Sequence, residues 1–435
     1  PFVIRPWRAC GGNRTLTERS PWAEVRGCAP GPALLKGRKT HEGHLVTQTI
    51  LVDSVSQAPR TGDPAGHTLG GAGERALDCL LAAGFGRTEP PILHPAAIFL
   101  DVSGEEVRRR LFLTADAAGE ELCLRPEYTI PVCRAYLSSD KAGKITEYSY
   151  LGPVFRARAG QVGEQTQTGL ESFGRRDAEA ADAEVFSLAM EAATAAGGGA
   201  LVARLGDAGL FDAMLDSLKI PEAWRRRLRR GVARGRSLEA IFSRPSQSAL
   251  AQPGVLAALE SADHAGAKAL VEDLLAIAGI DAVGGRSASE IADRFLEQAS
   301  LRSGQPIEAE KRAVLDAFLA ISGDPDQAAV ELRRLIQSAG LDLGAALDAF
   351  ERRNGFIAAR GVAIEATRFS AAFVRDFDYY TGFVFEAHDP HVPAAKIALA
   401  GGRYDGLARR LGANEDIPAV GAAINLDRLM NGGER

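Results

Sequence analysis

The sequence predicts a mixed α/β protein of the α+β class, in which a mainly antiparallel sheet with flanking helices is interrupted by a helical insertion. Short apolar runs bounded by Gly, Pro or Asp are typical of strands, and they occur in residues 67–204 and again in residues 351–435. Residues 205–350 are instead rich in Ala, Leu, Arg and Glu at helical spacing. A chain of 435 residues is long enough for two or three such domains.

Residues 1–66 differ from the rest of the chain because they carry Gly, Pro, Arg, Ser and Thr without apolar periodicity. Their basic character superficially resembles a transit peptide, since Glu18 and Glu24 are the only acids among the first 40 residues. The chain begins with Pro1 rather than Met, which favours a misassigned start. We expect this segment to be poorly ordered and without function.

The first part of the predicted core alternates helices with strands. Ala72–Ala83 places its apolar residues on one helical face, and Thr129–Leu137 tolerates Pro131 in its first turn. Glu147–Arg158 and Thr168–Phe173 are predicted to pair as strands around a loop that contains glycine. Shorter strands are expected at Ile92–Leu100, Arg110–Thr114 and Glu121–Arg125.

Strand-type sequence returns after the helical segment. Within that segment, Trp224–Arg236 holds seven arginines. Such a run is typical either of a patch for nucleic acid or phosphate, or of a solvated helix face balanced by acids elsewhere, and we favour the second interpretation. The later strands are expected at Ala363–Thr367, Val384–Ala387, Ile397–Ala400 and Ala419–Ile424.

Composition excludes several classes of function. The net charge of −5 and the pI near 5.9 provide no global field for nucleic acid or an anionic membrane. No apolar run approaches the ~20 residues of a membrane helix. His388-x-x-His391 and His41-x-x-His44 lack partner clusters, so we expect no metal site. The five cysteines are scattered along the chain at Cys10, Cys28, Cys79, Cys123 and Cys133. Their odd number and their spacing favour a reducing, cytoplasmic location over a disulfide framework.

Glu127 and Thr129 stand at a predicted junction of strand and helix, within Leu124-Arg-Pro-Glu-Tyr-Thr129. Because they lie two residues apart, both side chains point to the same side of an extended chain. A carboxylate and a hydroxyl together suit an ammonium group, which offers three donors. A structural turn with a helix cap would explain the same residues equally well.

Arg156 ends the run Leu151-Gly-Pro-Val-Phe-Arg156 and extends from the same strand face as Val154. Its planar guanidinium can bind a carboxylate or a phosphate through two hydrogen bonds. The neighbouring strand offers acceptors at alternating positions, among them Gln167 and Glu171. The alternatives are a surface salt bridge for Arg156 and a solvated strand residue for Glu171.

These segments and four other motifs, in the order in which they follow along the chain, resemble class II aminoacyl-tRNA synthetases in their histidyl form. The resemblance spans about residues 69–430 and implies a class II synthetase-like fold. The second class II motif region is matched by Arg125-Pro-Glu-x-Thr, Gly-Pro-Val-Phe-Arg156 and Glu171-Ser-Phe-Gly, and the third by Ala419–Leu429. Val374–Tyr380 and Gly401–Gly406 are similar to the two histidine-specific motifs, and Pro90–Pro95 is a degenerate match to the first class II motif, which builds the dimer interface.

The resemblance implies a histidine pocket. Glu127, Thr129 and Gln167 match positions that hold the amino group. Arg156 and Arg375 match positions near the carboxylate, and Glu171, Tyr380 and Tyr404 match the surroundings of the imidazole. Tyr379 and Asp378 could equally be core and turn residues.

Three departures from the synthetase pattern argue against ATP and tRNA binding. The segment Ala157–Thr166 is shorter than the family's ATP-binding loop and has no aromatic residue to stack on adenine. Asn425 stands where the family has glycine, so that its side chain would occupy space near the adenine. Arg428 survives, but alone it does not restore an ATP site. The chain also stops where the family's tRNA-reading domain would follow.

The pattern that remains resembles the regulatory subunits of ATP phosphoribosyltransferase, which are synthetase paralogues. The resemblance implies a non-catalytic histidine sensor without a cofactor, required by a short-form catalytic subunit and for feedback inhibition in the first step of histidine biosynthesis. It also implies a homodimer within a hetero-oligomer, expected to be a hetero-octamer, with no tRNA or membrane partner. The alternatives are a truncated histidyl-tRNA synthetase that activates histidine with ATP, and a free-standing histidine-binding or tRNA-mimic module.

Overall fold

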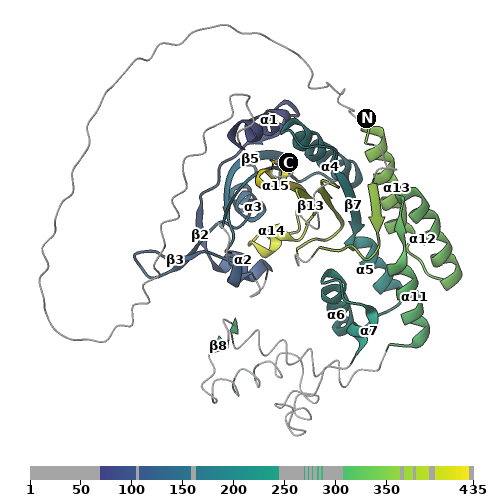
Figure 1. Ribbon diagram of the computed structural model, residues 1–435. Helices are drawn as coiled ribbons and strands as arrows, with labels where there is room; N and C mark the ends of the chain where they lie inside the picture. Colours follow the sequence, from purple (N-terminus) through teal and green to yellow (C-terminus); the bar gives the residue numbers. More distant parts are fainter. Residues whose placement is uncertain are drawn as a thin grey trace, which may run out of the picture. The chain divides into compact units, whose positions relative to one another are not determined.

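A nine-stranded sheet lies at the centre of the described part of the computed structural model (Figure 1). Its strand order is β1-β5-β6-β14-β13-β12-β7-β11-β10, and every neighbouring pair is antiparallel except β1–β5 and β7–β11. The predicted, mainly antiparallel core is therefore confirmed. The strands are β1 (Gly86–Arg87), β5 (Thr146–Phe155), β6 (Glu164–Phe173), β7 (Val202–Asp207), β10 (Ser322–Gly323), β11 (Thr367–Ser370), β12 (Phe383–His388), β13 (Leu399–Arg403) and β14 (Ala419–Asn425).

The structure describes most of the chain beyond residue 68. The expectations for residues 1–66, for Asp378 and for His41, His44 and His391 lie outside the described residues. The described ranges are 69–103, 107–157, 163–243, 307–362, 367–375, 379–390 and 397–430, with a few positions between 269 and 287.

One face of the sheet is covered by three helices, α1 (Leu69–Ala82), α4 (Ala178–Ala195) and α13 (Gly344–Ala359). In α1, Ala72, Ala76 and Leu80 recur at helical spacing and are fully buried, which confirms the predicted amphipathic helix. Helix α4 packs on β6, β13 and β14 and also against α13, which lies beside it in Figure 1.

The opposite face of the sheet packs against a second apolar cluster rich in tyrosine. Tyr150 of β5 stacks on Tyr128 with ring centroids 4.1 Å apart, and Phe173 of β6 stacks on Tyr136 at 4.5 Å. This cluster is completed by residues of a small sheet, of order β2-β4-β3, and of three short helices. These elements are β2 (Leu93–Pro95), β3 (Leu113–Ala115), β4 (Glu121–Leu124), α2 (Ala97–Ser103), α3 (Thr129–Leu137) and α14 (Leu407–Arg410).

The described residues between 205 and 350 are mostly helical, as predicted. The strand β7, however, runs to Asp207 and belongs to the central sheet, and short strands β8 (Ala282–Val283) and β9 (Arg286–Ser287) pair with each other. The domain boundaries at 205 and 350 remain a prediction. The helices other than α13 are α5 (Ala208–Ser217), α6 (Glu222–Ala233), α7 (Leu238–Phe242), α11 (Ala309–Ala320) and α12 (Pro325–Ala339).

Two predicted strands differ from the structure. The run Ile92–Leu100 is a strand only at Leu93–Pro95, because Pro95 cannot donate a ladder hydrogen bond and the apolar residues that follow, with Phe99 and Val102 buried, form α2. The run Arg110–Thr114 begins in a 3-10 turn at Arg108–Arg110. Of Ala363–Thr367, only Thr367 is described, as the first residue of β11.

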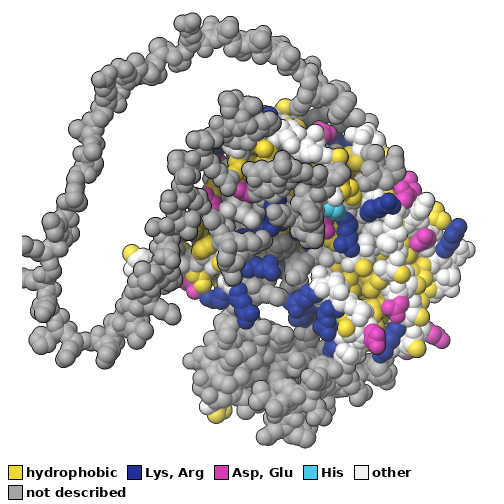
Figure 2. Space-filling view, in the orientation of Figure 1, with side chains coloured by type: hydrophobic (Ala, Val, Ile, Leu, Met, Phe, Trp, Pro, Cys, Tyr) yellow, Lys and Arg dark blue, Asp and Glu magenta, His cyan; other side chains and the backbone are white. Residues whose placement is uncertain are grey.

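The arginine run forms helix α6, where Figure 2 shows Lys and Arg side chains gathered on the surface. Several of these arginines have partners within the chain. Arg225 pairs with Asp216, Arg229 pairs with Asp212, and Arg227 Nη2 donates to the Ser243 carbonyl over 2.6 Å. These contacts support the interpretation of a solvated, charge-balanced helix face. Within the described ranges, no helix combines the length and apolar composition that a membrane span requires.

Candidate functional site

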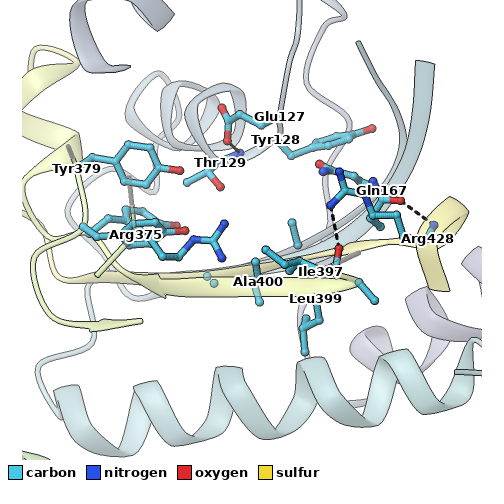
Figure 3. Close-up of a pocket in the computed structure, with 18 of the residues that line it drawn as sticks. Glu127, Tyr128, Thr129, Gln167, Arg375, Tyr379, Ile397, Leu399, Ala400 and Arg428 are labelled. Atoms are coloured by element: carbon cyan, nitrogen blue, oxygen red, sulfur yellow. Dashed lines mark hydrogen bonds between the residues drawn. The ribbon is translucent and has the colours of Figure 1, made fainter. Parts of the chain in front are cut away.

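A pocket opens between the start of helix α3 and the strands β13 and β14 (Figure 3). Arg375 and Tyr379 lie at one end, Gln167 and Arg428 lie at the other, and the segment from Ile397 to Ala400 forms the floor. Seven of the eight predicted site residues line this pocket, although they come from distant parts of the chain. They are Glu127, Thr129, Arg156, Gln167, Arg375, Tyr380 and Tyr404.

Glu127 lies at the N-terminus of α3 and caps it. Its two carboxylate oxygens accept hydrogen bonds from the backbone N–H groups of Thr129 (2.7 Å) and Ile130 (2.9 Å). Burial raises the pKa of Glu127, while these N–H groups and the nearby Arg156 oppose that rise. The cap considered from sequence is therefore present, and the same carboxylate also faces the pocket.

Glu171, the eighth predicted residue, lies behind the pocket wall rather than in it. It accepts hydrogen bonds from Thr129 Oγ1 over 2.8 Å and from the Tyr404 hydroxyl, and both donors line the pocket. Glu171 is fully buried, and burial raises its pKa to about 8. Its partner across the β6–β14 ladder is Gly421, where a Cβ would overlap the carboxylate. Glu171 thus orients two lining residues, and its direct contact with a ligand stays a prediction.

Gln167 brings an unused acceptor to the pocket. Its side chain is 4% exposed, and its Oε1 atom has no hydrogen-bond partner among the described residues. Leaving a buried acceptor unpaired costs about 1–3 kcal/mol, which a ligand donor could offset. Gln167 and Glu171 both lie in the regular ladder of β6, where they pair with Asn425 and Gly421 of β14. Because they are an even number of residues apart, their side chains point to the same face of the sheet, as predicted.

Two predicted arginines supply positive charge. Arg156 Nε donates to the Pro126 carbonyl over 2.7 Å, which fixes its stem beside Glu127. Arg375 Nη1 lies 3.4 Å from Glu386 Oε2, whereas the buried Arg375 Nε has no partner among the described residues. The pocket therefore presents acceptors, cations and aromatic rings together, as a zwitterionic amino acid with a polar side chain requires.

Four lining residues with polar side chains were not predicted as ligand contacts, namely Tyr128, Tyr379, Asn425 and Arg428. Tyr379 is 4% exposed and packs on Tyr380 with ring centroids 4.8 Å apart. The two tyrosines are adjacent and lie outside any strand, so alternation could not assign Tyr379 to the pocket. Tyr128 stands between two predicted residues, and its stacking on Tyr150 has no sequence signal.

Asn425 fills the end of the pocket next to β6. Its Nδ2 donates to Gln165 Oε1 over 3.0 Å, and its Oδ1 accepts from the backbone N–H of Arg428 over 2.9 Å. Arg428 Nη1 in turn donates to the Ile397 carbonyl over 3.0 Å (Figure 3). Hydrogen bonds within the chain therefore hold this end of the pocket together. Among the described residues, no group of three His, Cys, Asp or Glu side chains is arranged to hold a metal.

Comparison with known proteins identifies the family. The histidyl-tRNA synthetase family model matches residues 69–283 and 264–429. An ATP phosphoribosyltransferase regulatory subunit of Mesorhizobium japonicum is 42% identical over 353 residues, which cover 78% of this chain and 91% of that protein. That of Brucella anthropi is 40% identical over 346 residues, with 79% and 92% covered. The chain belongs to the histidyl-tRNA synthetase-like family of ATP phosphoribosyltransferase regulatory subunits.

Solved structures confirm the class II synthetase-like fold. A protein of Bacillus halodurans, described as an ATP phosphoribosyltransferase regulatory subunit/histidyl-tRNA synthetase, matches with a TM-score of 0.59 and 21% identity over 86% of this chain and 84% of that one. The histidyl-tRNA synthetase of Nostoc sp. matches with a TM-score of 0.54 and 18% identity over 85% and 74%. At these identities the likeness shows the fold alone.

Proposed function

We propose that this chain is a non-catalytic regulatory subunit of ATP phosphoribosyltransferase and that its pocket binds free histidine. The observation that carries the histidine assignment is the convergence of the Gln167 acceptor, the Glu127 carboxylate and Arg375 in one pocket walled by tyrosines. Glu127, Thr129 and Gln167 hold the ammonium group in this proposal. Arg156 and Arg375 hold the carboxylate, while Tyr380 and Tyr404, with Glu171 behind, surround the imidazole.

The proposed absence of synthetase chemistry rests on Asn425. Its side chain is 5% exposed and is hydrogen-bonded to Gln165 at the end of the pocket, and the synthetase resemblance places adenine there, so that a base in this position would have to displace the side chain. The rival function is a synthetase that forms histidyl adenylate. Histidine-dependent exchange of pyrophosphate into ATP distinguishes the two. We expect exchange at the background of a protein-free reaction, and robust exchange would overturn the non-catalytic assignment.

The proposed partner is a short-form ATP phosphoribosyltransferase catalytic subunit, in a hetero-octamer that works in the cytoplasm. Relatives at about 40% identity that are named regulatory subunits support this partner. Histidine can lower the partner's activity only if its affinity differs between two states of the complex. Co-expression with a short-form catalytic subunit tests the proposal. We expect a stable complex, activity that depends on this chain, and inhibition by histidine; two separate proteins with unchanged catalysis would contradict the partner assignment.

Self-association through the small sheet is part of the same proposal. Leu93 of β2 and Leu113 of β3 are 49% and 42% exposed, and Ile92 and Phe112 beside them are 40% and 39% exposed. Leu93 and Phe112 lie on the same face of the small sheet, since both stand opposite Leu124, and exposed apolar side chains gathered on one face are typical of an interface. Sedimentation analysis should show a dimer that Leu93→Asp converts to monomer, whereas Val330→Asp on the exposed side of α12 should leave the dimer intact. An unchanged dimer in Leu93→Asp would place the interface elsewhere.

A further inference from the structure

Four charged side chains form a buried cluster on the side of the sheet that carries α4 and α13. Arg403 comes from β13, Asp182 from α4, Arg353 from α13 and Asp207 from the end of β7. Each is at most 7% exposed. The two arginines and the two aspartates carry no net charge together, and each buried charge therefore has a partner of opposite sign in the cluster.

Asp182 joins the two arginines. Its Oδ1 lies 2.8 Å from Arg403 Nε and 2.7 Å from Arg403 Nη2, and its Oδ2 lies 3.8 Å from Arg353 Nη1. Arg353 Nη2 reaches Asp207 Oδ2 over 2.5 Å, and its guanidinium lies 4.5 Å from the centroid of the Phe383 ring. The cluster is therefore a continuous chain of contacts from α13 through α4 to β13.

The chain of contacts continues into the pocket wall through the backbone of β13. Arg403 is followed by Tyr404, which lines the pocket and holds Glu171. The Arg403 carbonyl accepts from the Thr381 N–H over 2.9 Å, and Thr381 follows the pocket residue Tyr380. A shift of Arg403 would therefore displace both tyrosines of the wall.

Asp405 fixes the same turn from its other side. Its Oδ1 accepts from Arg403 Nη1 over 2.9 Å and from the Ala419 N–H over 2.8 Å. The Tyr404 N–H donates to the Ala419 carbonyl over 2.7 Å. The guanidinium of Arg403 thus ties β13 to the start of β14 while it pairs with Asp182.

We propose that Arg403 is a positioning residue for the Tyr404 wall of the pocket and that, through Asp182 and Arg353, it couples the placement of helix α13 to histidine binding. The inference rests on the proposed histidine site. It assigns the arginine of the Gly401–Gly406 motif to the pocket's support rather than to ligand contact, since Arg403 points to the opposite side of the sheet. A displacement of α13 would leave Asp182 and Asp207 with fewer partners, and a low-dielectric interior makes that arrangement costly.

The test is calorimetric titration of histidine into the full chain and into the variants Arg403→Lys and Arg353→Lys. Both variants keep the positive charge but lose the planar guanidinium, which can make two hydrogen bonds to one carboxylate. Arg333→Lys is the matched control, because Arg333 joins the exposed sides of α12 and α13 through Glu351 over 2.5 Å and is 54% exposed. Titrations are made at a temperature where circular dichroism shows each variant to be folded. We expect histidine affinity to fall at least about fivefold in both cluster variants and to be unchanged in the control.

A double-mutant cycle with Tyr404→Phe separates positioning from general destabilisation. If Arg403 acts through Tyr404, then Arg403→Lys should weaken histidine binding much less in the Tyr404→Phe background than in the wild type. If Arg403→Lys does not fold, Asp207→Asn tests the same link from its α13 end. Equal affinity in wild type and cluster variants, or strictly additive effects in the cycle, would overturn the positioning role while leaving the histidine site intact. Absence of binding to the wild type would overturn the proposed function, and the inference with it.

Discussion

The two faces of the central sheet carry buried polar groups in different ways. On the pocket face, Gln167 Oε1 and Arg375 Nε have no partner within the described residues. On the opposite face, Arg403 and Asp182 are matched with each other, although Arg353 Nε and Asn354 Nδ2 of α13 likewise have no partner among the described residues. A ligand can supply the partner that an unpaired buried group lacks, whereas groups already paired within the fold lose stability when one of them is removed. The pocket face is therefore suited to a ligand, and the helical face holds the fold in place.

The largest expected effect is on the helical face. Asp182→Ala leaves Arg403 and Arg353 without their shared partner, so the free energy of unfolding should fall by about 3–5 kcal/mol. Urea denaturation measures this change. Glu351→Ala is the control, because its pair with Arg333 is exposed and should cost at most about 1 kcal/mol. Equal losses in the two variants would remove the distinction between a buried cluster and a surface pair.

On the pocket face, the expected effects are on affinity. Glu127→Ala or Arg156→Ala should weaken histidine binding by ~2–5 kcal/mol, because each leaves one charge of the bound zwitterion unpaired. Glu127→Ala should also cost about 1 kcal/mol of stability, since it removes the cap of α3. Calorimetry and thermal melts separate the two quantities. Unchanged affinity in both variants would mean that histidine binds elsewhere.

A substitution of Gln167 separates affinity from stability, which the buried pairs of the opposite face do not allow. Gln167→Met keeps the size of the side chain and removes the unpaired acceptor. We expect histidine affinity to fall by about 1–3 kcal/mol while the unliganded protein keeps or gains stability. Parallel calorimetry and urea denaturation measure both changes. A large loss of stability without loss of affinity would assign Gln167 to the core rather than to the site.

The smallest effect, taken per pH unit, concerns Glu171. Because burial raises the folded-state pKa of Glu171 to about 8, the folded protein binds more protons than the unfolded chain between the ordinary carboxyl pKa and pH 8. The stabilising contribution of this group is therefore largest at low pH and is lost as the pH rises toward 8. Relative to Glu171→Gln, the wild type should lose at most roughly 1 kcal/mol per pH unit in that window. Urea denaturation from pH 5.5 to 8.5 measures the difference, and a constant difference would show that Glu171 titrates normally.

Much of the pocket follows from short-range patterns in the sequence. The alternation of Gln167 and Glu171 along one strand predicts a shared side, and the structure has it. Glu127 and Thr129 also line one pocket, but not as residues of an extended chain, because Tyr128 between them has a helical conformation and lines the pocket as well. Arg375 and Tyr404 reach the same pocket because of the order of the strands in the sheet. No local pattern predicts that order, and the prediction of one common pocket came from the resemblance of the ordered motifs to the synthetase family. The second role of Glu127 as a helix cap was equally readable from its position before α3.

Other features depend on contacts between layers that no local pattern encodes. Arg353 and Arg403 meet Asp182 only because α4 packs against both α13 and β13, and the isolated helix sequence favours a solvated arginine. Glu171 lies behind the wall because Gly421 leaves room for its carboxylate across the ladder. The strand predicted at Ile92–Leu100 is present at Leu93–Pro95 but was wrong beyond Pro95, because apolar content alone does not distinguish a short buried helix from a strand.

The most direct test of the central claim is a calorimetric titration of the purified chain with histidine, compared with histidinol, which lacks the carboxylate. A pocket that pairs the carboxylate with Arg156 and Arg375 predicts saturable binding of one histidine per chain and histidinol binding that is weaker by at least about 2 kcal/mol. Absence of saturable histidine binding, or equal affinity for both compounds, would contradict the account.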